Sequence, residues 1–278
     1  MARLLLGKKL ADRLKEKTKQ KLAPLKTKPT LAIVSVGDNP AAVAYSRLAK
    51  RQMKKFGLPT AVYWFPGETG NGPFQKRFAA LNADPKNAAI MVMRPLPGQI
   101  NLKQTASTIA PTKDIDSLST KNLGLAFLDQ PQGFTPMAAQ AVIDMLTFYQ
   151  IPLAGKNVAV IGDSLLVGRP LSAMLLAKNA TVTTLNTYSK NLTAFTRRAD
   201  IVVTAAGEIN LLKASMVKSG VVVVDVGINF TASGQMVGDA DFSGIFPKAF
   251  AINPVPGGIG TVTNAMLPLR VVEATYHS

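Results

Sequence analysis

The segment with the clearest chemical meaning is Gly-Asp-Ser-Leu-Leu-Val-Gly-Arg-Pro at residues 162–170. It follows a predicted buried strand over residues 157–162 and precedes a predicted helix. Glycine lets the backbone approach a phosphate closely, and a helix N-terminus adds N–H donors and a positive dipole. The segment therefore predicts dinucleotide binding, with a tight strand–helix turn that holds no ligand as the alternative.

The identity of the nucleotide depends on the end of the next predicted strand. A site for NAD usually carries an acidic residue about 20 residues after the glycines. Here this place holds Asn186, Thr187 and Lys190, and the missing carboxylate favours the 2′-phosphate of NADP. Asp163 argues for NAD if it faces that phosphate, because like charges repel. We therefore expect NADP, with NAD not excluded.

Two further segments have compositions that favour ligand contact. Residues 254–260 read Pro-Val-Pro-Gly-Gly-Ile-Gly, in which the prolines stiffen the chain and the glycines permit close approach. Residues 224–229 read Val-Asp-Val-Gly-Ile-Asn and close a predicted strand. The alternatives are a surface loop for the first segment and a plain strand end for the second.

The elements that must position these segments alternate between strands and helices. Strands are expected over residues 30–36, 61–65, 88–93, 157–162, 180–185, 200–204, 221–226 and 250–252. Helices are expected over residues 5–22, 40–56, 73–82, 136–149 and 263–276. This order predicts parallel sheets, arranged as two α/β lobes with a cleft between them, the second lobe being Rossmann-like.

The charge of the chain is strongly basic and unevenly distributed. The sequence of 278 residues holds 32 Lys and Arg against 16 Asp and Glu, a net charge of +16, and residues 1–60 alone hold 15 basic and 3 acidic residues. Such a field attracts polyanions, namely nucleic acid, phosphorylated cofactors or carboxylate-rich substrates. The alternative is a solvated helix face, because Leu10, Leu14 and Leu22 are spaced as on an amphipathic helix. No nucleic-acid-binding motif accompanies the charge, so we expect no specific nucleic-acid partner.

Several classes of protein are excluded by composition. The chain has no cysteine, which removes thiolate catalysis and Cys-ligated metals, and its one histidine is His277. We therefore expect no metal site. No apolar run reaches the roughly 18–20 residues of a membrane span, and the N-terminal apolar stretch is too short for a secretory signal. We expect a cytoplasmic protein that does not bind membranes.

Taken together, these segments resemble the bifunctional methylenetetrahydrofolate dehydrogenase/methenyltetrahydrofolate cyclohydrolase family. The resemblance extends in order over nearly the whole chain. It is carried by residues 36–41 with Tyr45, and by residues 94–97, 113–116, 135–136, 162–170, 224–229, 238–242 and 254–260.

The resemblance implies a fold, an activity and a division into domains. Residues 1–118, completed by a C-terminal helix over about 263–278, are expected to form a three-layer folate-binding lobe. Residues 137–262 are expected to form the NADP-binding lobe. The implied reactions are hydride transfer from 5,10-methylenetetrahydrofolate to NADP and hydrolysis of the resulting 5,10-methenyltetrahydrofolate. Members of the family commonly form homodimers, so a homodimer is expected. With a folate as the implied substrate, the basic first lobe is expected to attract polyglutamate tails.

The resemblance also implies roles for single residues. Tyr45 and Asp116 match folate-binding positions and are the expected catalytic residues, together with Lys50 as a substitute amine. Further substrate contacts are expected at Pro95, Leu96, Pro256, Gly257 and Gly258. Cofactor contacts are expected at Gly162, Asp163, Ser164, Arg169, Thr187 and Ile228.

The sequence departs from the family at the proton-transfer pair. The lysine expected four residues after Tyr45 is Ala49, and its glutamine partner is Met93. Lys50 is one residue further and is turned by about 100° around the helix. General acid–base catalysis contributes typically 10²–10⁴-fold, so the hydrolysis should suffer more than the hydride transfer. The alternative function is a catalytically impaired folate- or nucleotide-binding paralogue.

Overall fold

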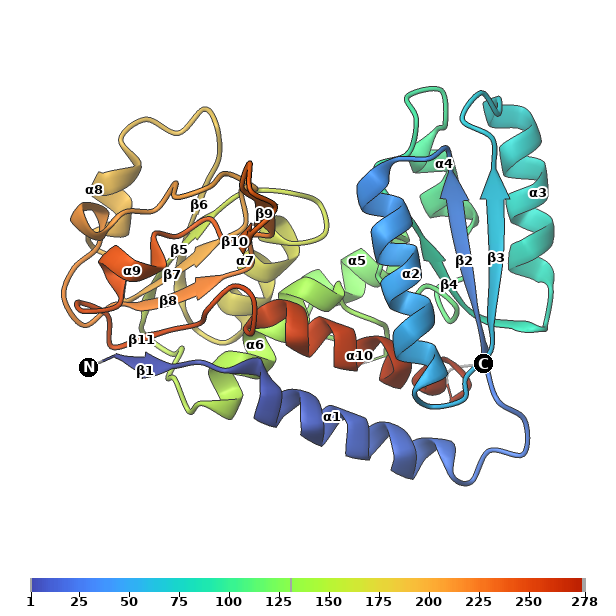
Figure 1. The fold of residues 1–278 in the computed structure, drawn as a ribbon, viewed down its shortest axis with the longest axis horizontal. Coiled ribbons are helices and arrows are strands. Elements are labelled where there is room, and N and C mark those ends of the chain that lie inside the picture. Colours follow the sequence, from blue (N-terminus) through green and yellow to red (C-terminus); the bar gives the residue numbers. More distant parts are fainter. Residues whose placement is uncertain (1, 131, 277–278) are drawn as a thin grey trace. The chain divides into compact units, whose positions relative to one another are not determined.

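The computed structural model describes residues 2–130 and 132–276, shown as a ribbon in Figure 1. The chain divides into two compact units. Unit 1 contains the described residues up to Asp12, with Phe127–Asp129 and Ala138–Thr263. Unit 2 contains Arg13–Ala126, the described part of Gln130–Met137, and the chain from Asn264 onward. His277 lies outside the described residues.

Unit 2 is built around a three-stranded parallel sheet. Its elements follow one another as β2 (Thr30–Val36), α2 (Pro40–Lys54), β3 (Thr60–Phe65), α3 (Asn71–Ala83) and β4 (Asn87–Val92). The strand order is β3-β2-β4, and both pairs are parallel. The predicted alternation of strands and helices in this part of the chain is confirmed.

Both faces of this sheet are covered by helices. On one face Phe74 and Phe78 of α3 stack with ring centroids 5.7 Å apart and pack with Val34 of β2 and Phe65 of β3. Because side chains alternate along a strand, Ile33 of β2 points to the opposite face. The helix α2 buries Ala42, Ala49 and Met53. It begins where Pro40 occupies the first turn and the Asn39 side chain accepts hydrogen bonds from two backbone N–H groups.

Some elements of unit 2 are not predicted by the sequence pattern. These are α4 (Leu102–Thr108) and α5 (Thr120–Phe127), both short. The last helix, α10 (Ile259–Ala274), begins four residues earlier than expected and contains Pro268. Near its end Glu273 accepts ion pairs from Lys17 at 3.3 Å and Lys21 at 3.2 Å.

Unit 1 is a Rossmann-like layer with a six-stranded parallel sheet. The strands are β1 (Arg3–Leu4), β5 (Asn157–Ile161), β6 (Thr181–Leu185), β7 (Ile201–Thr204), β8 (Val222–Asp225) and β11 (Ala251–Ile252), in the order β1-β11-β8-β7-β5-β6. Its helices are α6 (Met137–Phe148), α7 (Gly168–Ala177), α8 (Leu192–Thr196) and α9 (Phe242–Ile245), with a 3₁₀ turn at Ala214–Met216 and a small hairpin of β9 (Asn229–Phe230) and β10 (Met236–Val237). The short strand β1 is not predicted, because two residues carry no period. Two α/β units with parallel sheets confirm the predicted fold class.

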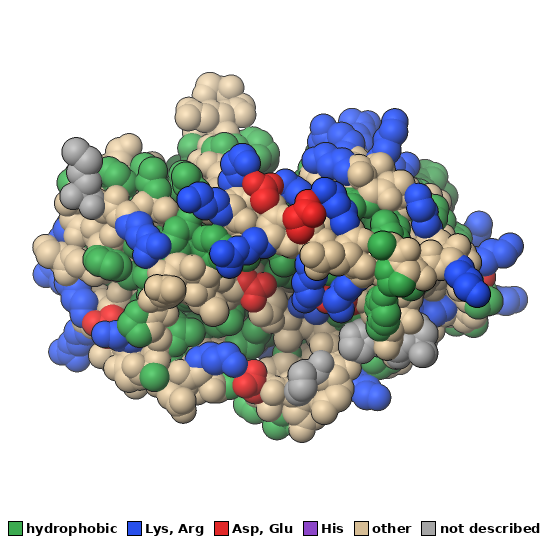
Figure 2. Space-filling view, turned by 90° about the horizontal axis from the view of Figure 1, so that it is seen from below, with side chains coloured by type: hydrophobic (Ala, Val, Ile, Leu, Met, Phe, Trp, Pro, Cys, Tyr) green, Lys and Arg blue, Asp and Glu red, His purple; other side chains and the backbone are tan. Residues whose placement is uncertain are grey.

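The basic N-terminal helix is α1 (Gly7–Leu22), close to the predicted range. It buries Leu10, Ala11 and Thr18 and exposes most of its lysines. Figure 2 shows Lys and Arg side chains spread over the face that carries α1, with acidic side chains among them. Attraction of polyglutamate tails by this helix stays a prediction.

No helix in the described part of the chain is long and apolar enough to cross a membrane.

Candidate functional site

The loop after β5 brings two backbone segments of unit 1 into close contact. Gly162 has φ +111°, and a Cβ at this position would collide with the carbonyl oxygen of Ala205 in the loop after β7. A Cβ at Gly168 would collide with the carbonyl oxygen of Gly162. Both glycines are therefore required by the geometry, and α7 begins at the second of them.

A cavity of about 430 Å³ lies at the carboxyl ends of β5, β6 and β7. In an open parallel sheet the point where neighbouring strands connect in opposite directions is the usual ligand site. Here β5 is flanked by β6 and β7. The cavity is lined by Ile161, Gly162, Asp163, Ser164, Asn186, Thr187, Leu192, Ala205, Ala206, Glu208 and Leu211. Four of the predicted cofactor residues are in this set.

Two other predicted cofactor residues lie outside the cavity lining. Arg169 is exposed on α7 and contacts Asp163, with Nε donating to the Asp163 carbonyl oxygen at 2.8 Å. Ile228 follows β8 and is exposed. The structure therefore joins Arg169 to the site through Asp163.

Two buried carboxylates hold the loops that line this cavity. Asp239 accepts backbone hydrogen bonds from Ala206 at 2.6 Å, Gly207 at 3.1 Å and Glu208 at 3.1 Å. Asp225, at the end of β8, accepts from Thr204 Oγ1 at 3.0 Å and from the backbone N–H of Asp239 at 3.1 Å. Burial raises the pKa of Asp225, and its hydrogen bonds oppose that rise. The sequence motif marked Asp225 as a strand end but gave no sign of this role.

The proline–glycine segment is anchored to the same network. Asn253 is buried, accepts from the Asp225 backbone N–H at 2.7 Å and donates to the Asp225 carbonyl oxygen at 2.9 Å. Gly258 has no room for a Cβ beside Asn253, and the Gly257 carbonyl accepts from Gly7 N–H at 2.8 Å. Pro256 is exposed. These contacts place the segment within unit 1.

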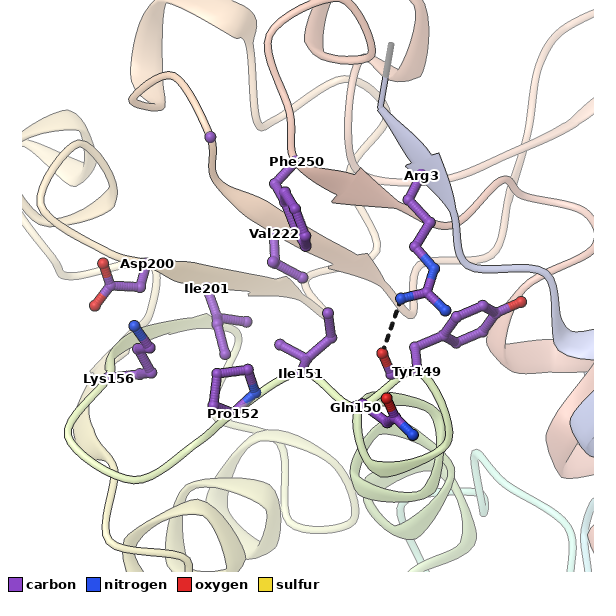
Figure 3. Close-up of a pocket in the computed structure, with 11 residues that line it drawn as sticks. Arg3, Tyr149, Gln150, Ile151, Pro152, Lys156, Asp200, Ile201, Val222 and Phe250 are labelled. Carbon is purple, nitrogen blue, oxygen red and sulfur yellow. Dashed lines mark hydrogen bonds between the residues drawn. The ribbon is translucent and has the colours of Figure 1, made fainter.

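A second cavity, of about 340 Å³, lies at the amino ends of β5, β7, β8 and β11, beside β1 (Figure 3). Its polar groups are used by the protein itself. Arg3 donates to the Tyr149 carbonyl oxygen at 3.0 Å and lies 4.8 Å from the Tyr149 ring centre. Asp200 accepts from Lys218 at 2.6 Å and from the Asn157 backbone N–H at 2.9 Å. The Arg3 contacts hold β1 against the end of α6, and the Asp200 contacts join the start of β7 to the start of β5 and to Lys218.

In unit 2 the structure groups Tyr45, Arg94 and Asp116. The Nη2 atom of Arg94 lies 3.7 Å from Oδ2 of Asp116. Asp116 also accepts a hydrogen bond from the Met137 backbone N–H at 3.3 Å. Burial raises the pKa of Asp116, and the Arg94 guanidinium lowers it. Burial likewise raises the pKa of Tyr45, with Asp116 adding to the rise and Arg94 opposing it. Tyr45 is therefore a protonated hydrogen-bond donor near neutral pH.

The positions of the missing proton-transfer pair are apolar and closed. Ala49 is 1% exposed and Met93 is 3% exposed. Tyr45 and Ala49 share a face of α2, whereas Lys50 is exposed and lies about 140° around the helix from Tyr45. The structure thus places Arg94, rather than Lys50, beside Asp116. Pro95 is exposed, and Leu96 packs on the core of unit 2.

The turn around Asp116 is held by side chains from several segments. Ser117 is buried with φ +57° and donates its hydroxyl to the Phe134 carbonyl oxygen. Arg270 of α10 donates to Thr135 Oγ1 at 3.0 Å and lies 5.2 Å from the Phe134 ring centre. Its charge also lowers the pKa of Asp116. Sequence reasoning missed Arg270, because nothing in a late helix signals contact with residue 116.

Among the described residues, no group of three or more His, Asp or Glu side chains is placed to hold a metal ion.

The fold and the cavity define an α/β protein with a dinucleotide-type site, and known proteins share its fold. The model of the tetrahydrofolate dehydrogenase/cyclohydrolase catalytic domain matches residues 5–116, and that of the NAD(P)-binding domain matches residues 136–278. The bifunctional protein FolD of Lactobacillus delbrueckii subsp. bulgaricus is 41% identical over 279 residues, covering 99% of this chain and 98% of that protein.

Solved structures agree over the same length. The bifunctional enzyme FolD of Campylobacter jejuni superposes with a TM-score of 0.95 at 38% identity, covering 99% of each chain. The Trypanosoma brucei enzyme, solved with NADP and an inhibitor, gives 0.92 at 28% identity, covering 100% of this chain and 99% of that one. The chain belongs to the tetrahydrofolate dehydrogenase/cyclohydrolase family.

The close backbone approach at Gly162 yields a prediction with a matched control. Gly162→Ala should lower the thermal unfolding temperature at least roughly twice as much as Gly155→Ala. Positive φ costs an alanine about 1–2 kcal/mol in either variant, and only Gly162→Ala adds a collision with Ala205. Gly155 also has positive φ, +73°, but its Cβ would meet nothing within 4 Å. Equal losses in calorimetry would show that the contact with Ala205 is unimportant.

Proposed function

We propose that this chain oxidises 5,10-methylenetetrahydrofolate with NADP and hydrolyses 5,10-methenyltetrahydrofolate to the 10-formyl product. The observation that carries the proposal is the 41% identity to a bifunctional FolD over the full length of both chains. The matches to both domain models and the cavity at the β5–β7 strand ends support it.

The cavity of unit 1 fits a dinucleotide. Gly162 and Gly168 leave only backbone at the start of α7, which allows a phosphate to approach, and Ser164 and Thr187 add hydroxyls to the lining. When bound there, NADP supplies a hydride acceptor. Asp239 and Asp225 hold the loop after β7, so the cavity is formed before a ligand arrives. Ile228 completes the proposed cofactor contacts.

The proposed folate contacts are those that the family resemblance implies. In unit 2, Asp116 would accept hydrogen bonds from the pterin while Tyr45 packs against the substrate and donates its hydroxyl proton. The remaining proposed substrate contacts are Pro95, Leu96, Pro256, Gly257 and Gly258. Support for these roles comes from the family resemblance and, for Tyr45 and Asp116, from their grouping around Arg94.

The weakest part of the proposed activity is proton transfer during hydrolysis. Arg94 is the cation beside Asp116, and an arginine does not lose its proton in proteins. Ala49 and Met93 carry no group that can exchange a proton. These observations favour a second candidate, a catalytically impaired paralogue that binds folate and nucleotide without turnover. Hydride transfer depends on the orientation of two bound molecules and needs neither side chain.

One assay separates the two candidates. The full chain is mixed with 5,10-methylenetetrahydrofolate and NADP, and absorbance is followed for NADPH, for the methenyl product and for its decay. We expect NADPH to form. After correction for decay in buffer, the methenyl product should decay more slowly than with a family member that carries the lysine. Binding of both ligands without NADPH formation would establish the second candidate.

A homodimer is also proposed from the family resemblance, and the cytoplasmic location expected from the sequence stays a prediction. Light scattering of the purified chain measures the first.

Restoring the missing pair should restore the hydrolysis. In Ala49→Lys with Met93→Gln, the new amine would sit on the buried face of α2, where burial lowers the pKa of a lysine towards neutrality. We expect methenyl hydrolysis at least about tenfold faster than in the unmodified chain, with a smaller change in the dehydrogenase rate.

The matched control is Lys50→Ala, measured in the same assay. Loss of hydrolysis in this variant would identify Lys50 as the substitute amine, as the sequence predicts. An unchanged rate in the double variant would contradict the assignment of positions 49 and 93 to proton transfer.

Ionisation of Asp116 should set the pH dependence of folate binding. The carboxylate accepts hydrogen bonds only when ionised, so affinity should fall as pH falls through its pKa. Arg94 lowers that pKa; Arg94→Leu should therefore move the midpoint to higher pH by about one unit. Arg94→Lys, which keeps the charge, is the control. Identical midpoints in titrations of folate affinity against pH would contradict the coupling of Arg94 to Asp116.

A further inference from the structure

The strand-end cavity of unit 1 contains a carboxylate at an unexpected place. Asp163 follows Gly162 in the loop after β5, and its Oδ2 accepts from Asn186 Nδ2 at 3.4 Å. Asn186 is the first residue after β6. The Asp163 side chain is 39% exposed and lines the cavity. A carboxylate from one loop thus reaches the end of the neighbouring strand.

The orientation of Asn186 is fixed by its own turn. Its Oδ1 accepts from the Tyr188 backbone N–H at 3.0 Å, and its backbone N–H donates to Ser189 Oγ at 2.9 Å. The amide nitrogen of the side chain is therefore the group turned to Asp163. This arrangement holds the carboxylate at the end of β6 and leaves its remaining lone pairs for a ligand.

In a dinucleotide site the residues at the end of the second strand, here β6, contact the adenosine ribose. An acidic residue there accepts a hydrogen bond from the 2′-hydroxyl of NAD, whereas a 2′-phosphate, with a charge of about −1.5 to −2, is repelled. The strand end itself supplies no acid, because the polar residues that follow it are Asn186, Thr187, Ser189 and Lys190. Asp163 supplies it from the adjacent loop.

Arg169 acts in the opposite direction. Its Nη2 lies 3.4 Å from Asp163 Oδ2, and its side chain is 66% exposed. An exposed guanidinium can bind a 2′-phosphate through bidentate hydrogen bonds. The pair therefore combines one group that favours NADP with one that favours NAD.

We propose that Asp163 is the specificity-determining residue of the cofactor site, which lowers the affinity of this chain for NADP relative to NAD and makes NAD a competent cofactor. The proposal rests on the proposed function and refines it. Repulsion from the carboxylate offsets the attraction of Arg169 for the 2′-phosphate, so the wild-type chain should discriminate weakly between the two dinucleotides.

The test is calorimetric titration of the full chain with NAD and NADP, and with 5′-AMP and adenosine 2′,5′-bisphosphate, which differ only in the 2′-phosphate. Asp163→Asn keeps the shape and removes the charge. We expect the ratio Kd(NADP)/Kd(NAD) to fall by about tenfold, equivalent to one decade in affinity. The same shift is expected for the adenosine pair, and it should shrink at high salt.

Glu208→Gln is the matched control, because it removes another carboxylate from the lining of the same cavity. Its ratio should change less than about threefold, which is below one decade. Asp163→Ser provides a second variant if Asp163→Asn unfolds, as judged by circular dichroism.

Two results would overturn the proposal while leaving the proposed function intact. The first is an unchanged ratio Kd(NADP)/Kd(NAD) in both Asp163 variants, provided that they still bind the cofactors. The second is a shift of this ratio in Glu208→Gln that equals the shift in Asp163→Asn. Failure of the wild-type chain to bind either dinucleotide would instead overturn the proposed function and the cofactor site with it.

Discussion

The cofactor cavity depends on the burial of two carboxylates among backbone N–H groups. Asp225 and Asp239 lie under the loops at the strand ends, and a buried charge is tolerated only when hydrogen bonds replace its lost water. Each accepts several N–H groups from chain segments that are far apart in sequence. Asn253 extends the same network to the proline–glycine segment. Exchanging these bonds for water would release the loop after β7, which forms one wall of the cavity.

Unit 2 shows a different use of burial. Tyr45 and Asp116 are kept at a raised pKa by desolvation, and the opposing cation is Arg94. An arginine orients neighbouring groups and supplies a positive charge, but it does not exchange a proton. The cluster is therefore suited to binding a polar ring system and poorly suited to moving protons. Ala49 and Met93, which are buried nearby in the same unit, carry no group that can exchange a proton.

Relatives of this chain retain the same architecture at modest identity, 38% for the Campylobacter jejuni structure with a TM-score of 0.95. The constraint on the scaffold comes from backbone contacts such as Gly162 with Ala205 and Gly168 with Gly162, where no side chain fits. Residues at the rim, including Asp163 and Arg169, are under no such steric constraint.

The sequence by itself determined the strands and helices of strong period, such as β2 over 30–36, because the pattern of apolar residues is a local property. It also determined the glycine loop, the proline–glycine segment and the absence of a lysine at position 49. It did not determine β1, α4 or α5, since short elements carry too few residues to show a period. Only the tertiary structure decided that Arg94 faces Asp116, that Arg270 joins them from the last helix, and that Asp163 reaches the end of β6. These are contacts between distant segments, and their distances are set by how sheets and helices pack rather than by any spacing along the chain.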